Sequence, residues 1–412
     1  MYREFVVALT SDPCRLRCLF SKDSFFRSWK MNKFPGGSIE WENILSKPPH
    51  SEYDIIGMVV FKASKYILSG CSPGTTKSNA HRLLLDHGFI HPVGSGLYSL
   101  LPLGQRVIDK LIRLIDAELE SIGALKVSLP ILGSRVLWDK TLRWESMGSE
   151  LFCIKDRHQV EYCLQPTAEE MCTHLISQLP NLKKRVFPLL LYQTTEKFRD
   201  EMNPRFGLLR AREFLMNDLY SFDLDKNSAV KTYSMVCDIY DRLFRDKLGL
   251  EVYKVDPKPG IHGGSDSHEY HLRNPLDEDG IHFCFKLLPA IVEVLLEPKE
   301  GIRLPPIIAP FSAAVVVKRD LMLNSITDMM LSTLDRQLEG DVLFDDRVED
   351  TIGKRIKGLQ EIGIPRIVVI GKVTESTINE VPKFEYISSQ RGCCAPCEKQ
   401  ELSLNEMMQV IV

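Results

Sequence analysis

The chain has 412 residues, enough to bury two or three cores of ordinary domain size. Its hydrophobic content of 44% and charged content of 26% are typical of a soluble globular protein, and no apolar run reaches the roughly 18 residues of a membrane span. The net charge of −3 excludes a histone-like or nonspecific nucleic-acid binder, although a nucleic-acid enzyme with a local basic face stays compatible with it.

The eleven cysteines are an odd number and are scattered along the chain, which predicts reduced thiols in a reducing compartment. Cys393, Cys394 and Cys397 are close enough in sequence to suggest zinc, but no second pair with finger-like spacing lies nearby. We therefore predict no metal site built by the protein alone.

Residues 1–75 show weak periodicity and several turn signals, so we expect an N-terminal extension without a defined fold. The first 30 residues carry six basic and three acidic side chains, which is consistent with a transit peptide but not a pure signal for one. A disordered leader and an incorrectly predicted start are the alternatives.

From residue 78 the chain is strongly patterned. The clearest helix is predicted over 105–122, where apolar residues recur at helical spacing and Gly123 is placed to end it. Further elements are expected in this order: a strand at 126–130, a helix from Ala168, strands at 189–194 and 197–201, an extended segment at 212–222 and a helix at 228–248.

The segment after Leu304-Pro305-Pro306 alternates strands with helices. We expect strands at 307–317, 341–345 and 365–371, with helices at 321–338 and 352–362. This alternation predicts a small α/β domain with a largely parallel sheet.

A group of charged and aromatic residues with regular spacing surrounds a central loop. Arg199 and Glu201 are followed, after eight intervening residues, by Arg210, and then by Phe214 and Asp218 at intervals of four. An arginine presents a planar fork that can contact a phosphate and a carboxylate together. If Arg199 and Glu201 lie on one strand, alternation directs both to the same face. A surface hairpin with charged residues is the alternative interpretation.

This pattern resembles motif 2 of the class II aminoacyl-tRNA synthetases, and the loop Asn-Pro-Arg-Phe-Gly-Leu-Leu at 203–209 resembles that of the prolyl-tRNA synthetases of bacterial and mitochondrial type. The resemblance implies that Arg199 binds the α-phosphate and the amino-acid carboxylate, that Glu201 and Arg210 hold the nucleotide, that Phe214 stacks on adenine and that Asp218 belongs to the ATP site. A synthetase for serine, threonine or glycine is disfavoured by the same loop.

The segment Pro166-Thr167-Ala168-Glu169-Glu170 supports two interpretations that can both hold. Thr167 is placed to cap a helix, and Glu170 would complete a capping box. The segment also resembles the Thr-x-Glu signature with which prolyl-tRNA synthetases bind the proline imino group, which implies that Thr167 and Glu169 contact the two N–H groups of the substrate.

Two further segments continue the resemblance. Residues 123–130 resemble motif 1, which implies that Pro130 lies at a homodimer interface. The stretch Gly-Gly-Ser-Asp-Ser-His-Glu at 263–269 resembles a family segment near the amino-acid pocket, which implies that His268 lies near bound proline.

Motif 3 is the point at which the resemblance fails. The arginine expected to bind the γ-phosphate is replaced by Lys286, the preceding glycines are missing, and only about 20 residues separate Glu269 from Ala290. A skipped exon and a degenerate paralogue both explain this gap. The alternative to an active ligase is therefore a catalytically inactive tRNA-binding or regulatory protein on the same scaffold.

The C-terminal segment resembles the anticodon-binding domain of class II synthetases, and it implies tRNA contacts at Arg347, Lys354 and Arg355. The fold class implied by the whole resemblance is α+β: an antiparallel-sheet catalytic domain at 76–300, then an α/β anticodon-binding domain at 305–412. The implied reaction uses ATP, Mg²⁺, L-proline and tRNA(Pro) in a homodimer. The expected location is the mitochondrial matrix, with the cytoplasm as the alternative, and no membrane association is expected.

Overall fold

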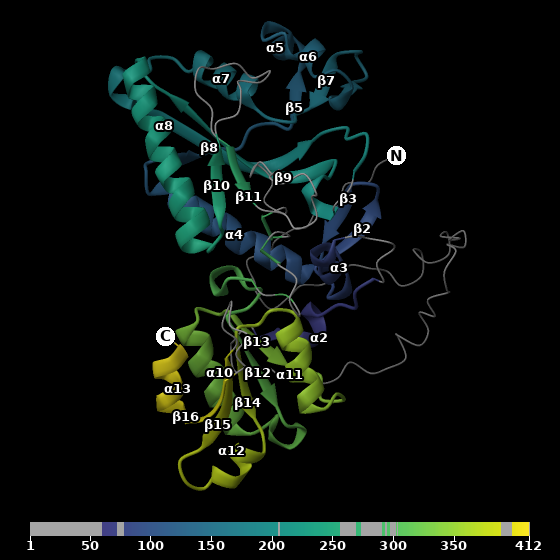
Figure 1. Cartoon of the computed structure of the whole chain (residues 1–412), viewed down its shortest axis with the longest axis vertical. Helices are drawn as coiled ribbons and strands as arrows, with labels where there is room; N and C mark the ends of the chain where they lie inside the picture. Colours follow the sequence, from purple (N-terminus) through teal and green to yellow (C-terminus); the bar gives the residue numbers. More distant parts are fainter. Residues whose placement is uncertain are drawn as a thin grey trace, which may run out of the picture. The chain divides into compact units, whose positions relative to one another are not determined.

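The computed structural model describes residues 60–71, 78–204, 207–255, 269–272, 291–292, 295–296, 302, 304–388 and 398–411 (Figure 1). Within these ranges no helix is both long and apolar enough to span a bilayer. The predictions for His268, Lys286 and the three C-terminal cysteines lie outside the described residues.

The elements before residue 200 are β1 (Phe61–Lys62), α2 (Ala63–Tyr66), α3 (Asn79–Asp86), β2 (Ile90–Gly94), β3 (Leu97–Leu100), α4 (Pro102–Glu120), β4 (Leu125–Lys126), β5 (Leu132–Ser134), α5 (Arg135–Lys140), α6 (Arg143–Ser146), β6 (Phe152–Lys155), β7 (Glu161–Leu164), α7 (Glu169–Gln178) and β8 (Leu189–Phe198). The later elements are β9 (Glu213–Phe222), α8 (Lys226–Asp241) with a π-helical turn at Arg242–Lys247, β10 (Val252–Val255), β11 (Glu269–Leu272), β12 (Ala313–Val317), α10 (Ser325–Gln337), β13 (Val342–Asp345), α11 (Ile352–Glu361), β14 (Arg366–Ile370), α12 (Lys372–Thr377), β15 (Lys383–Ser388), β16 (Glu398–Ser403) and α13 (Leu404–Ile411).

Helix α4 confirms the strongest prediction from periodicity. It begins with Pro102, whose fixed φ suits the first turn of a helix, and it buries Val107, Leu111 and Leu119 on one face. Gly123 follows the helix with φ of +80°, a conformation that glycine adopts without strain.

The sheet formed by β4, β8 and β9 differs from the prediction in two places. The strands expected at 189–194 and 197–201 are one continuous strand, β8, which ends at Phe198 and pairs antiparallel with β9 from Leu189↔Phe222 to Phe198↔Glu213. The strand expected at 126–130 is only β4, which pairs parallel with β8. Ladder pairing along the whole of β9 keeps β8 extended through the polar residues Thr194–Glu196.

Three smaller sheets complete this part of the chain. They are the hairpin β2–β3, the antiparallel sheet β5-β7-β6 and the hairpin β10–β11. In Figure 1 the sheet β5–β7 lies with α5 and α6 at one end of the drawing, next to α7. The antiparallel pairing agrees with the predicted α+β class.

The C-terminal sheet has the order β1-β13-β12-β14-β15-β16, and it is parallel from β1 to β14 and antiparallel beyond. Strand β12 is buried on both faces: Val315 and Val317 pack with the apolar residues of α10 and α13, whereas Ala314 and Val316 pack with those of α11. Figure 1 shows α10 and α11 on opposite sides of this sheet.

The end of the predicted N-terminal extension is part of this C-terminal sheet. Phe61 and Lys62 pair in parallel with Leu343 and Phe344, and Ser64 donates two hydrogen bonds to Asp346. The expectation of an unstructured segment up to residue 75 is therefore wrong for this stretch. A two-residue strand is too short to show a periodicity of its own.

Asp341 connects α4 to the residues around β12 and β13. It accepts hydrogen bonds from Arg106 and Lys110, each at 2.5 Å, and from the backbone N–H and hydroxyl of Ser312. Burial lowers the pKa of Lys110, and Asp341 counteracts that effect.

Candidate active site

One face of the β8–β9 ribbon carries the residues of the predicted motif 2. Side chains at alternate positions share a face, and the register places Lys197 opposite Phe214 and Gln193 opposite Asp218. Beyond the end of β8, the backbone N–H of Arg199 donates to the carbonyl of Arg212 at 2.9 Å, so Arg199 continues this face.

Arg199 has an unused donor in a confined position. Its guanidinium carbon lies 5.6 Å from the centre of the Phe214 ring, and its Nε is buried without a hydrogen-bond partner among the described residues. A buried donor without a partner is costly unless a ligand or water satisfies it. The position therefore suits a bound anion.

Glu201 and Arg210 meet across the loop. Arg210 Nε donates to Glu201 Oε2 at 2.8 Å, and Arg212 donates to the backbone oxygen of Glu201 at 3.0 Å. The argument from strand alternation fails for Glu201 because β8 has already ended, and a turn contact from the Glu201 N–H to the Arg199 carbonyl places it instead. The predicted pair is nevertheless brought together.

Phe214 and Asp218 are both largely buried. Phe214 packs with Ala211 and Met216. The Asp218 carboxylate accepts hydrogen bonds from Lys197 at 3.1 Å, Gln193 at 3.0 Å and Tyr220 at 2.5 Å. Both oxygens of Asp218 therefore bind neighbouring side chains of the β8–β9 face, and its contact with ATP stays a prediction.

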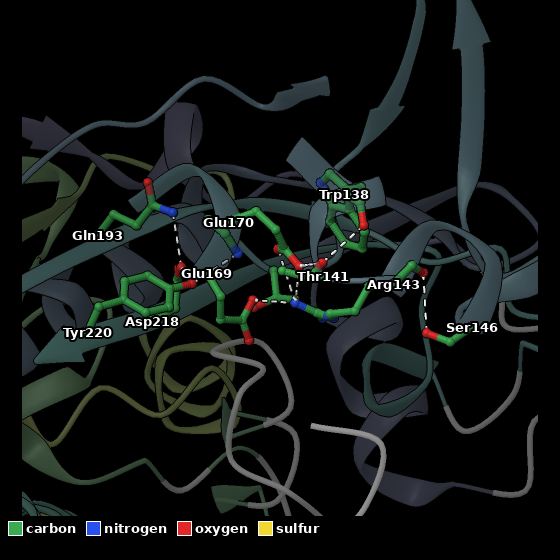
Figure 2. Close-up of polar contacts among 11 residues, drawn as sticks. Trp138, Thr141, Arg143, Ser146, Glu169, Glu170, Gln193, Asp218 and Tyr220 are labelled. Atoms are coloured by element: carbon green, nitrogen blue, oxygen red, sulfur yellow. Dashed lines mark hydrogen bonds and ion pairs between the residues drawn. The ribbon is translucent and has the colours of Figure 1, made fainter. Parts of the chain in front are cut away.

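The Thr-x-Glu segment lies beside the same face (Figure 2). The hydroxyl of Tyr220 accepts a hydrogen bond from the N–H of Ala168 at 2.9 Å, which fixes the start of α7 against β9. Burial and the Asp218 carboxylate raise the pKa of Tyr220, so its hydroxyl stays protonated.

The structure contradicts the predicted capping box, but Thr167 and Glu169 lie together as predicted. Helix α7 has Ala168 at its N-cap, without a side-chain cap, so Thr167 is not the N-cap residue. The hydroxyl of Thr167 instead donates to Glu169 Oε2 at 2.5 Å. Glu170 is buried and bonds to Thr141 and Arg143, which leaves it unable to cap the helix.

Arg143 joins both carboxylates, as Figure 2 shows. Its Nη1 lies 3.1 Å from Glu169 Oε2 and 2.9 Å from Glu170 Oε1. Burial alone would raise the pKa of Glu169, but the hydrogen bond from Thr167 and the charge of Arg143 lower it below its usual value. Glu169 is therefore an anion at neutral pH.

Sequence reasoning missed four residues of this site: Thr141, Arg143, Lys197 and Tyr220. Lys197 and Tyr220 have the same strand parity as Arg199 and Phe214, so the β8–β9 register, if assumed, would have placed them on the same face. Arg143 comes from the four-residue helix α6, and no local sequence pattern indicates that it contacts Glu169 and Glu170.

The three predicted tRNA contacts do not share one environment. Lys354 is 71% exposed and pairs with Asp350, whereas Arg347 is largely buried and binds Asp345 at 2.7 Å. Arg355 is buried and donates to the carbonyls of Val317 and Asp345, so its predicted tRNA contact is wrong. It supports the ends of β12 and β13 instead.

No group of three or more metal-binding side chains occurs in the part of the chain that the structure describes. A magnesium ion held mainly by phosphate oxygens needs only one or two protein carboxylates, so such a group is not required.

Comparison with known proteins identifies the family. Residues 152–287 match the model of the tRNA synthetase class II core domain (G, H, P, S and T). The chain is 35% identical over 371 residues to the probable mitochondrial proline--tRNA ligase of Homo sapiens. That alignment covers 71% of this chain and 78% of the human protein. It is 45% identical over 206 residues to the corresponding protein of Schizosaccharomyces pombe, and that alignment covers 50% of this chain and 48% of the yeast protein. It is 40% identical over 226 residues to the proline--tRNA ligase of Cupriavidus taiwanensis, and that alignment covers 54% of this chain and 39% of the bacterial protein.

Solved structures share the fold. The prolyl-tRNA synthetase of Giardia lamblia in complex with prolyl-adenylate aligns with a TM-score of 0.67 at 17% identity, with 80% of this chain and 73% of that one covered. The Cryptosporidium parvum enzyme complexed with halofuginone and AMPPNP aligns with a TM-score of 0.66 at 16% identity, with 83% and 78% covered. From the sequence matches, the chain belongs to the proline--tRNA ligase family of class II aminoacyl-tRNA synthetases.

Proposed function

We propose that this chain is an aminoacyl-tRNA ligase that activates L-proline with ATP and transfers it to tRNA(Pro). The observation that carries the proposal is that two groups lie beside the β8–β9 face: a hydrogen-bonded Thr167–Glu169 pair, and an Arg199 Nε that has no partner among the described residues. The first group suits a secondary ammonium ion, and the second suits an anion.

In the first step an oxygen of the proline carboxylate attacks the α-phosphorus of ATP. The new bond is a mixed anhydride, and the bond to the β-phosphate breaks, so pyrophosphate leaves. Arg199 would neutralise charge on both reacting anions, because its fork can contact phosphate and carboxylate together. Thr167 and Glu169 would hold the imino nitrogen, so much of the acceleration would come from positioning.

Three groups would hold the nucleotide. Glu201 and Arg210 form one edge of the site across the loop, and Phe214 lies beneath Arg199 as the proposed adenine-stacking surface. Glu201 is the carboxylate that would hold Mg²⁺ here, and the ion would supply charge neutralisation to the ATP phosphates. In the second step a hydroxyl of the terminal ribose of the tRNA attacks the proline carbonyl, and AMP leaves.

The quaternary structure and domain roles are part of the proposal. An antiparallel catalytic region at 76–300 would be followed by an anticodon-binding region at 305–412, with Lys354 as the exposed basic contact. Pro130 is exposed, and so are the apolar side chains of Ile131 and Leu132 that follow it, which supports a homodimer interface at that surface. The named mitochondrial relatives support the mitochondrial matrix as the location.

Proline-dependent exchange of pyrophosphate into ATP tests the proposal on the purified chain. We expect exchange with proline, and little or none with serine, threonine or glycine. Binding of tRNA(Pro) without any exchange would support the inactive alternative that the altered motif 3 suggests. Sequencing of the transcript between the codons for Glu269 and Ala290 would show whether a segment with the missing glycines and arginine is spliced in.

A further inference from the structure

Arg143 is held in one orientation by its backbone and by an aromatic ring. It follows Leu142, which has φ of +61°, a left-handed conformation that a leucine rarely adopts. Its guanidinium carbon lies 4.9 Å from the Trp138 ring centre, and its side chain is only 11% exposed. The left-handed backbone at Leu142 costs conformational free energy, and the confined side chain of Arg143 has few alternative positions.

Glu170 fixes the charged end of Arg143. The Glu170 side chain is 2% exposed, and its two oxygens lie 2.9 and 3.1 Å from Arg143 Nη1. The hydroxyl of Thr141 donates to the same carboxylate at 2.9 Å. A buried carboxylate needs such a partner, so Glu170 and Arg143 hold each other in place.

Arg143 in turn fixes one oxygen of Glu169 and leaves the other available. Oε2 of Glu169 receives hydrogen bonds from Thr167 and Arg143, whereas Oε1 accepts none from the described residues. The Glu169 side chain is 44% exposed, so Oε1 can reach a ligand. The arrangement orients a carboxylate by one oxygen and presents the other.

We propose that Arg143, held by the buried Glu170, is a positioning residue that orients Glu169 toward the ring nitrogen of L-proline. This inference rests on the proposed function, because it assumes that Glu169 contacts the amino acid. It assigns to Arg143 no contact with ATP. Loss of Arg143 should therefore weaken the use of proline while leaving the use of ATP intact.

The first test compares Arg143→Lys with Arg135→Lys in pyrophosphate exchange. Lysine keeps the charge, but its shorter and more flexible side chain does not place an ammonium where Arg143 Nη1 contacts both Glu169 and Glu170. We expect the KM for proline to rise about 10-fold or more in Arg143→Lys, because charged hydrogen bonds are lost, while the KM for ATP changes less than about 2-fold. Arg135 is the matched control, since it is a nearby arginine that pairs with Asp139 and Glu161 and has no contact with Glu169.

Two milder variants keep the test informative if Arg143→Lys does not fold. Both Glu170→Gln and Thr141→Val should raise the KM for proline, and the increase should be larger for Glu170→Gln. Direct titration with a non-reactive sulfamoyl analogue of prolyl-adenylate measures binding without turnover. The affinity for this analogue should fall in the same variants in which the KM for proline rises.

The pH profile separates positioning from a merely structural role. The groups that face Glu169 are Arg143 from α6, Thr167, its neighbour Glu170 on α7, and Tyr220 from β9. In the wild type the KM for proline should stay flat as pH falls toward 5. In Arg143→Lys it should begin to rise at higher pH, because the Glu169 anion has lost the hydrogen bond from Arg143 Nη1.

Equal changes in the KM values for proline and ATP, or a lower melting temperature with both KM values unchanged, would overturn the inference alone. A wild-type chain that neither exchanges nor binds the proline analogue would overturn the proposed function and the inference with it.

Discussion

Lys197 and Asp218 form an ion pair on the β8–β9 face with side chains only 3% and 9% exposed. Removal of one member of such a pair leaves the other charge buried without compensation. Asp218→Ala should therefore lower the free energy of unfolding by about 3 kcal/mol or more, measured by urea denaturation.

Lys357→Ala is the control for this prediction, because Lys357 pairs with Glu361 at 3.8 Å on the surface with 78% of its side chain exposed. Its effect should be below about 0.5 kcal/mol. Equal effects of the two substitutions would show that the Lys197–Asp218 pair is not buried in solution.

Cys153 of β6 should be more reactive than Cys163 of β7 and Cys172 of α7. Burial raises the pKa of Cys163 to about 12 and that of Cys172 to about 11, so both stay as buried thiols, whereas Cys153 is exposed. Iodoacetamide at about pH 8, followed by peptide mass spectrometry, should modify Cys153 well before Cys163 and Cys172. Denaturant should abolish the difference, and rapid labelling of Cys163 in the native protein would refute the prediction.

Single residues also mark the limit of prediction from sequence. Thr167, Glu169, Arg199 and Arg210 could be named as candidates because they fall in two short motifs that resemble those of the family, and the structure brings Thr167 to Glu169 and Arg210 to Glu201. Arg355 was misplaced, because whether a helical arginine faces solvent or the ends of β12 and β13 is decided by packing that a short charged segment does not reveal.

Hairpin β2–β3 supports the motif 2 loop through a glycine. Gly96 has φ of +73°, its carbonyl accepts the N–H of Arg212 at 2.8 Å, and a Cβ added there would lie 2.8 Å from Pro204 Cβ. Gly96→Ala should displace the loop that carries Glu201 and Arg210 and raise the KM for ATP by about 10-fold or more, as expected when positioning groups move.

Gly123→Ala is the matched control for the hairpin, because Gly123 has a similar φ of +80° but no atom within 4 Å of the added Cβ. Both variants should lose about 1 kcal/mol of stability from the left-handed backbone. Only Gly96→Ala should change the kinetics with ATP, and a similar change in Gly123→Ala would refute the role of the hairpin.

Elements with strong helical periodicity were predicted well, as α4 and α11 show. The boundaries of β4, β8 and β12 were not, because strand length depends on the partner strand as well as on local composition. Strand β12, for example, begins at Ala313 although the apolar run begins six residues earlier, since Pro306–Ile308 forms a 3-10 turn.

At the scale of the whole molecule, Asp341 is one of the residues through which α4 contacts the C-terminal sheet region, together with the carbonyls of Ala309 and Pro310. Asp341→Ala leaves Arg106 and Lys110 without their carboxylate, so we expect a loss of about 3 kcal/mol or more in thermal or urea unfolding. Asp320→Ala, which removes an exposed partner of Lys318, should cost less than about 1 kcal/mol.

The pH dependence gives this prediction a sign. Burial already lowers the pKa of Lys110, and without Asp341 it should fall further. The unfolded chain then binds more protons than the folded one, so stability rises with pH. The destabilisation by Asp341→Ala should thus be smaller at about pH 9.5 than at pH 7, and a destabilisation that grows with pH would contradict the proposed burial of Lys110.

The pairing of β1 with β13 also sets the order in which the protein can be completed. Ser64 and its partner Asp346 are 282 positions apart, and a ribosome adding roughly 5–20 residues per second needs tens of seconds to synthesise that interval. Throughout that time the segment that forms β1 has no strand to pair with. The β1 edge of the C-terminal sheet can therefore form only after β13 has been made, and closing so long a loop is slower than forming local contacts.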